Sequence, residues 1–198
     1  MLEIVARALE PRVLEALEDT RVVVVLGARQ AGKSTLVQQI ASERLGATVL
    51  TLDDAVTREA AIADPTGFVA DHQTPVVIDE VQRAPDLLLA IKARVDRDLR
   101  PGQYLLTGSA NILTAPTIAD ALAGRTEYLR LGPFAQSELS GAGTTFVSDI
   151  LDGRWPRVPG RGVGRSAYAE IVATRGFREA ERGAARDVLE PWSQGLLE

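Results

Sequence analysis

The chain has 198 residues, of which 45% are hydrophobic and 25% charged, and its net charge of −5 argues against a wholly basic protein that coats nucleic acid. It contains no cysteine and a single histidine, His72, which excludes disulfides and thiolate metal sites and disfavours a zinc site. Its longest apolar run, Val22–Leu26, is far too short to span a membrane and the N-terminus lacks the basic start of a signal peptide, so we expect a globular, cytoplasmic protein without a membrane partner.

The N-terminal segment is predicted to form an amphipathic helix that packs on the main domain. Its apolar residues recur at helical spacing, at Leu2, Val5, Leu9, Val13, Leu14 and Leu17. The β-branched run Val22–Leu26 follows, and its composition is typical of a strand that is buried on both faces.

That strand leads directly into the phosphate-binding pattern G-x-x-x-x-G-K-[ST]. Glycines at positions 27 and 32 would let the backbone curl around an anionic phosphate chain, and the positive end of the following helix favours the same charge. Lys33 would reach the β- and γ-phosphates, and Ser34 would be a ligand of Mg²⁺. We therefore predict nucleoside triphosphate binding by Gly27, Ala28, Arg29, Gln30, Ala31, Gly32, Lys33, Ser34 and Thr35. The alternative is a glycine-rich turn without a ligand, in which Arg29 merely faces solvent.

The rest of the first 140 residues alternates between helices and strands. A helix ends at Gly46, a strand covers 48–52, and Asp53 and Asp54 cap the next segment. Further strands are predicted over 75–79, 104–107 and 126–131, with a helix that begins near Pro85. Its buried face would consist of Leu87, Leu88, Ile91, Val95 and Leu99. This alternation predicts an α/β fold with a parallel sheet between layers of helices.

Two adjacent carboxylates, Asp79 and Glu80, end the third predicted strand. The carboxyl ends of parallel strands are where open α/β sheets bind their ligands, so the pair reads as a Walker B motif. Asp79 would hold Mg²⁺ through its water shell, and Glu80 would orient and deprotonate the attacking water. In the alternative interpretation the pair caps the helix near Pro85.

Three small polar residues, Thr107, Ser109 and Asn111, follow at the end of the next strand. Any of them could sense the γ-phosphate or position the water, although such residues are also common in turns. Arg125 starts the fifth strand and could stabilise charge as an arginine finger, within its own subunit or in a neighbour. The alternative for Arg125 is a surface salt bridge.

From about Gly141 the sequence changes character. The stretch Gly141–Gly164 is rich in glycine, proline and arginine and reads as a linker, and helical patterns resume at 166–173 and 178–189. Its arginines could form a local nucleic-acid patch, although charged runs are usually solvated. We divide the chain into an ATPase-like domain over 1–140 and a second part over 141–198, which consists of the glycine- and arginine-rich linker and a helical segment.

Taken in order, five motifs resemble a family of AAA-type P-loop ATPases from bacteria and archaea whose second half is a domain of unknown function. The motifs are Gly27–Ser34, Asp79–Pro85, Leu106–Asn111, Leu122–Arg125 and Leu131–Leu139. The resemblance implies ATP with Mg²⁺, self-association, and a three-layer P-loop fold whose five parallel strands are ordered 5-1-4-3-2. Family members usually continue well past the length of this chain, so we expect a truncated form or a fragment.

These residues leave three functions open. An ATPase would couple hydrolysis to the rearrangement of an attached or partner module, and Glu80 beside Asp79 favours water as the nucleophile. A nucleotide-dependent binding switch would order loops for a protein or DNA partner with little turnover. A P-loop kinase would need an acceptor site, for which the sequence offers no constellation.

Overall fold

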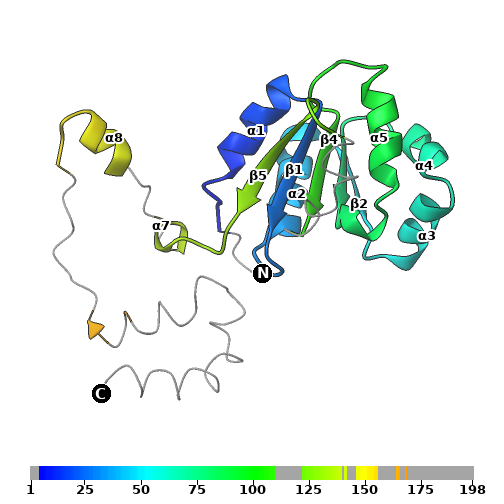
Figure 1. The fold of residues 1–198 in the computed structure, drawn as a ribbon. Coiled ribbons are helices and arrows are strands. Elements are labelled where there is room, and N and C mark those ends of the chain that lie inside the picture. The colour runs from blue at the N-terminus through cyan, green and yellow to red at the C-terminus, as the bar shows by residue number, and fades with distance from the viewer. Residues whose placement is uncertain are drawn as a thin grey trace. The chain divides into compact units, whose positions relative to one another are not determined.

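The computed structural model describes residues 5–109, 122–139, 141, 146–155, 164, 165 and 168 (Figure 1). The chain divides into two compact units, each described separately below. The core unit comprises Ala8–Gly132, and the flanking unit comprises Met1–Arg7 together with Pro133–Glu198. Asn111 and the helical patterns predicted over 178–189 lie outside the described residues, and only Tyr168 is described within 166–173.

The core unit is built on a five-stranded sheet in the order β2-β3-β4-β1-β5. Its strands are β1 (Val22–Gly27), β2 (Thr48–Thr51), β3 (Val76–Asp79), β4 (Tyr104–Gly108) and β5 (Thr126–Leu131). All neighbouring strands pair in parallel. Read from the other edge, this order is 5-1-4-3-2, so the predicted topology is confirmed.

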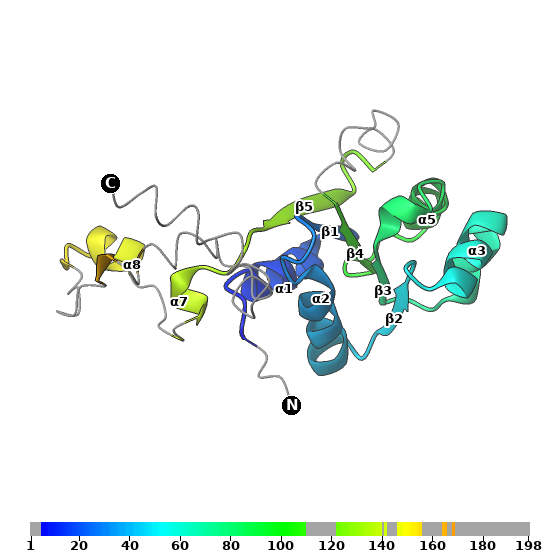
Figure 2. The same ribbon diagram turned by 90° about the horizontal axis from the view of Figure 1, so that it is seen from below.

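Helices cover both faces of this sheet, as the two views of Figures 1 and 2 show. One face carries α1 (Glu10–Asp19) and α2 (Lys33–Ile40), which continues as the π-helix Ala41–Leu45. The other face carries α3 (Ala55–Ala63), α4 (Pro65–Asp71) and α5 (Leu87–Val95), with the short 3-10 helix Val81–Arg83 before α5. The predicted three-layer α/β fold is therefore confirmed.

The central strand explains why the sequence folds in this way. Every residue of β1 is buried, because the strand has neighbours on both sides and helices over both faces. Val23 and Val25 pack in the cluster under α1 and α2, whereas Val22, Val24 and Leu26 pack in the cluster under α3–α5. A continuous apolar run is the pattern that such a strand requires.

Some details differ from the sequence-based expectation. Helix α5 ends at Val95, so Leu99, predicted as part of its buried face, is 71% exposed. Two helices between β2 and β3 were not predicted as such. Asp54 does cap the first of them, α3, by accepting a hydrogen bond from the Thr57 backbone N–H at 2.8 Å.

The flanking unit contains two short helices within its described residues, α7 (Gln136–Leu139) and α8 (Phe146–Leu151). A buried ion pair joins the two chain segments of this unit, with Arg7 Nε 3.1 Å from Glu138 Oε1. The Arg7 guanidinium also lies over the Phe134 ring at 4.1 Å. Helix α8 falls in the stretch that was predicted to be a linker. No helix in the described part of the chain is long and apolar enough to cross a membrane.

Candidate functional site

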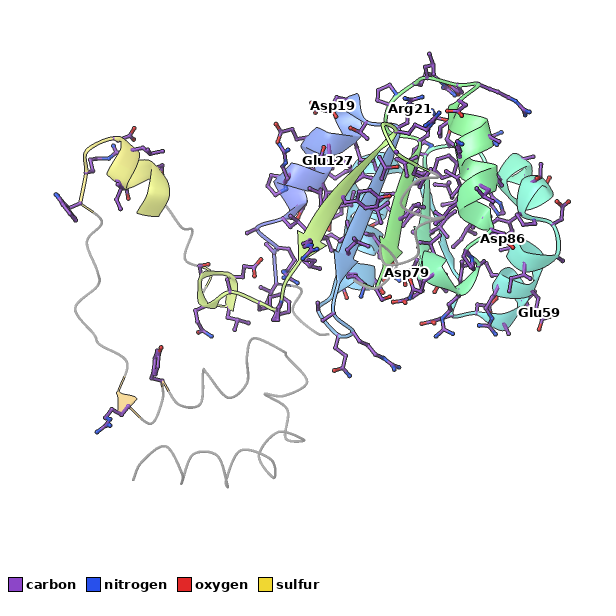
Figure 3. The ribbon with its side chains drawn as sticks, viewed as in Figure 1. Asp19, Arg21, Glu59, Asp79, Asp86 and Glu127 are labelled. Atoms are coloured by element: carbon purple, nitrogen blue, oxygen red, sulfur yellow. The ribbon has the colours of Figure 1, made fainter. Side chains whose placement is uncertain are left out.

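The phosphate loop and the acidic pair lie at the carboxyl edge of the sheet, because parallel strands all end on the same side. The phosphate loop follows β1, the acidic pair ends β3, and β4 lies between these two strands. Figure 3 shows Asp79 at this edge, with Arg21 and Glu127 at the opposite edge. The fold therefore brings the two halves of the predicted nucleotide site together.

Lys33 occupies the interior of the phosphate loop. Lys33 is the first residue of α2 and is buried, with 5% of its surface exposed. The Nζ ammonium donates hydrogen bonds to the carbonyl oxygens of Gly27 at 3.1 Å and Ala28 at 3.0 Å. These two bonds hold the ammonium inside the loop and use two of its three donors. The third donor can serve a phosphate oxygen.

Left-handed backbone shapes the loop at Gln30, with φ +66°, and at Gly32, with φ +90°. Alternating left- and right-handed residues turn successive N–H groups toward one concavity, which is how backbone nests bind anions. The Ala31 N–H bonds the Ala28 carbonyl at 3.3 Å and closes the turn. The exposed Arg29 and Gln30 lie on the outside of this turn.

Gly27 is needed for a reason that the phosphate-binding pattern does not contain. A Cβ at this position would lie 2.4 Å from the carbonyl oxygen of Leu131, its paired residue on β5. The close approach of two strand backbones, rather than a left-handed conformation, therefore requires glycine here. This contact is a second reason for glycine at position 27, and the role of Gly27 in phosphate binding stays a prediction.

Thr107 organises the two carboxylates from the end of β4. Its fully buried hydroxyl donates a hydrogen bond to Asp79 Oδ1 and accepts one from the Glu80 backbone N–H at 2.9 Å. Thr107 was predicted as a sensor of the γ-phosphate, but both bonds of its hydroxyl point to the acidic pair. Glu80 adopts a left-handed conformation with φ +60°, which the hydrogen bond from its N–H to Thr107 helps to hold.

A second link joins Glu80 to the segment after β4 through Gln82. The Gln82 Nε2 donates to Glu80 Oε2, and its Oε1 accepts from the Ser109 backbone N–H at 3.3 Å. The sequence analysis assigned no role to Gln82. Two signals pointed to it, namely its place in the motif Asp79–Pro85 and its spacing of two residues from Glu80, which lets a long amide side chain fold back on the carboxylate.

The acidic pair does not cap a helix through its side chains. Asp86 is the N-cap residue of α5, and Glu80 precedes the 3-10 helix Val81–Arg83 without a side-chain capping bond. The capping alternative is therefore wrong for this fold. Asp79 is 4% exposed and engages Thr107 through Oδ1, so within the described residues its other oxygen is available to a cation or to the water around it.

The donors at this edge suit Mg²⁺. Hydroxyl and carboxylate oxygens are hard ligands, and Ser34 and Asp79 supply one of each. The described residues contain no group of three or more acidic, histidine or cysteine side chains that could enclose a metal by themselves. Mg²⁺ typically binds through one or two carboxylates together with substrate phosphates and water, and the residues present fit that pattern.

The structure does not bring Arg125 to this edge. Its carbonyl accepts a hydrogen bond from the Val22 N–H, at the start of β1 and therefore at the opposite end of the strand from Gly27. Its guanidinium forms an ion pair with Asp96, which holds the pKa of that carboxyl below its usual value. This position fits the salt-bridge alternative for Arg125. It does not fit an arginine finger that acts on the phosphate loop of the same core unit.

Comparison with known proteins shows which family the chain belongs to. Residues 19–140 match the family described as AAA domain (AAA_14). Two uncharacterized mycobacterial proteins, Rv2008c of Mycobacterium tuberculosis and Mb2031c of Mycobacterium bovis, are each 35% identical to the chain over 121 residues. That alignment covers 61% of this chain but only 27% of either relative, so the chain spans about a quarter of the length of these curated relatives.

A solved structure shares the fold at much lower identity. The Walker-type ATPase PABY2304 of Pyrococcus abyssi superimposes with a TM-score of 0.57 at 16% identity, covering 98% of this chain and 73% of that protein. Such low identity supports the architecture alone. The family match extends over most of the chain and includes the phosphate loop, the acidic pair and the end of β4. The chain therefore belongs to the AAA domain family of P-loop ATPases.

Proposed function

We propose that this chain binds ATP with Mg²⁺ and hydrolyses it, and that hydrolysis drives the rearrangement of an attached or partner module. Lys33 contacts the β- and γ-phosphates, and the loop Gly27–Thr35 surrounds them with backbone N–H groups. Ser34 and Asp79 hold Mg²⁺, which neutralises phosphate charge when bound. Glu80 orients and deprotonates the attacking water, and Ser109, which follows β4, senses the γ-phosphate or helps to position that water.

The observation that carries this proposal is the hydrogen-bond network around the acidic pair. Thr107 bonds both Asp79 and the backbone of Glu80, so one buried hydroxyl sets the relative position of a metal-holding group and a base. Buried polar groups are normally hydrogen-bonded, and here one hydroxyl serves both residues of the pair while Gln82 holds the Glu80 carboxylate. Catalysis by positioned charge depends on such preorganisation.

Substitution of Glu80 by glutamine tests the proposal. The purified chain is titrated with ATP, ADP and GTP by calorimetry with and without Mg²⁺, and phosphate release is followed for the same samples. Glu80→Gln is expected to bind ATP normally and to lose turnover by at least about 100-fold, which is the lower range for a general base. Glu59→Gln, an exposed carboxylate on α3, is the matched control and should keep full turnover.

The outcomes separate the candidate functions. Equal phosphate release by the wild type and Glu80→Gln would remove Glu80 from the mechanism. Tight ATP binding with negligible turnover in the wild type would instead favour a nucleotide-dependent switch for a protein or DNA partner. The mass in solution, measured with and without ATP, tests the expected self-association.

A further inference from the structure

We propose that Gln82 is a positioning residue, which orients the Glu80 carboxylate and couples it to the segment after β4. This role rests on the proposed ATP hydrolysis, because it concerns the base of that reaction. Gln82 belongs to the 3-10 helix Val81–Arg83, directly after Glu80. Its amide reaches Glu80 on one side and the backbone of Ser109 on the other.

The chemistry of the two contacts fixes the orientation of the amide. A carboxylate only accepts hydrogen bonds, so the NH₂ group of Gln82 must face Glu80. The carbonyl oxygen then faces the Ser109 N–H, which can only donate, at 3.3 Å. A flipped amide would lose both bonds and place two acceptors together. Both polar groups of the Gln82 amide are therefore used, one by Glu80 and the other by Ser109.

Glu80 needs such a restraint because, within the described residues, its other hydrogen bonds are made by its backbone alone. The Thr107 hydroxyl accepts its N–H at 2.9 Å and φ is +60°, which places the Cα but leaves the side-chain torsions open. A general base works only when its oxygen lies within hydrogen-bond reach of the water. The Gln82 Nε2 bonds Oε2 and thereby selects one rotamer, so that Oε1 can face the water.

The same contacts link Glu80 to β4. Thr107 and Ser109 lie two residues apart at the end of that strand, which separates the strand of the phosphate loop from the strand of the acidic pair. A displacement of the Ser109 backbone would pull on Gln82 and move the carboxylate. Gln82 thus makes the orientation of the base depend on the position of the Ser109 backbone.

Kinetics of the full chain test this proposal. Gln82→Ala is expected to lower kcat at least about tenfold, since a positioned general base contributes roughly 10²–10⁴-fold and part of this depends on its orientation. The ATP dissociation constant, measured by calorimetry, should stay within about twofold, because within the described residues the side-chain hydrogen bonds of Gln82 join Glu80 and Ser109 and not the phosphate loop. Gln82→Glu keeps the shape, loses the donor and should lower kcat as well. Gln73→Ala, at an exposed glutamine before β3, is the matched control.

A double variant decides whether Gln82 acts through Glu80. In single-turnover reactions, Glu80→Gln and Glu80→Gln with Gln82→Ala should show the same residual rate, because a missing base cannot be misplaced. A further fall in the double variant would overturn the proposal and indicate a general structural role. Full kcat in Gln82→Glu, with Glu80→Gln inactive, would overturn the positioning role but leave the proposed function intact. A wild type no faster than Glu80→Gln would overturn both.

Discussion

Substitution of Gly27 by alanine separates two reasons for a glycine at the start of the phosphate loop. The sequence pattern assigns Gly27 to the phosphate chain, whereas the structure places the Leu131 carbonyl oxygen 2.4 Å from a Cβ at this position. Contacts below 3.0 Å are essentially never seen for Cβ atoms, so β1 and β5 must separate by about 0.6 Å at this point. The position of a Cβ is set by its own backbone, and the carbonyl oxygen also belongs to the backbone, so no side-chain rotation can relieve the clash.

The cost should appear in stability even without nucleotide. Overpacking in a well-packed interior costs about 1–3 kcal/mol, and two paired backbones belong at the upper end of that range. For a chain of 150–250 residues, about 2–3 kcal/mol lowers Tm by roughly 4–12 °C. The last pair of the β1–β5 ladder is Gly27 with Leu131, so the end of that ladder is the region that we expect to loosen.

Thermal and urea unfolding of the nucleotide-free chain measure this effect. Gly132→Ala is the matched control, because Gly132 follows Leu131 directly, lacks a positive φ and has nothing within 4 Å of its ideal Cβ. It should be neutral or slightly stabilising, by up to about 1 kcal/mol. An unchanged Tm for Gly27→Ala together with weakened ATP binding would refute the steric reasoning. Glycine at this position would then be required for phosphate binding alone.

Three further predictions follow from the charged groups. Lys33→Met should weaken ATP binding at least about tenfold in calorimetry, because a hydrogen bond to a charged group contributes roughly 1.5–3 kcal/mol. Lys92→Met changes the other lysine of the chain and should leave ATP binding unchanged. Arg125→Met should leave phosphate release in dilute solution unchanged, because the Arg125 guanidinium pairs with Asp96 at the edge away from the phosphate loop. A loss in dilute solution would contradict this geometry, and a loss only at high protein concentration would support a finger role in a neighbouring subunit. Side-chain and backbone hydrogen bonds from Arg100 hold the pKa of Asp98 at about 2, below the ordinary 3.8, so this pair stabilises the fold above about pH 4 and loses that contribution as the pH falls toward 2. Carboxyl NMR of Arg100→Met should show the Asp98 titration returning toward 3.8, and an unchanged midpoint would refute the assignment.

Local patterns were sufficient to predict the sheet and the two motifs of the site. A continuous run of β-branched residues is typical of a strand covered on both faces, and the strand Val22–Gly27 is fully buried. The loop after it and the carboxylates that end β3 are contiguous in the chain, so their positions relative to their strands needed no tertiary information. Helices α3 and α4 were harder to predict, because α3 buries only Ala61 and its apolar periodicity is weak.

The place of Arg125 could have been predicted from the topology alone. In a parallel sheet the first residue of a strand lies at the edge opposite to the ligand-binding loops, and Arg125 directly precedes β5. The sequence already indicates that Arg125 starts the fifth strand, and the start of a parallel strand lies at the end of the sheet away from the phosphate loop. The ion pair with Asp96, twenty-nine residues away in the chain, depends on packing that no local pattern contains.

The sequence by itself determined the fold class, the phosphate loop and the acidic pair, because each depends on hydrophobic periodicity or on residues that are neighbours in the chain. Only the tertiary structure decided what Gly27, Thr107 and Gln82 do. Each of them contacts a residue of another strand or the segment that follows one, namely Leu131, Asp79 and Ser109 respectively. Such contacts depend on the order and register of parallel strands, which arise when the whole sheet assembles.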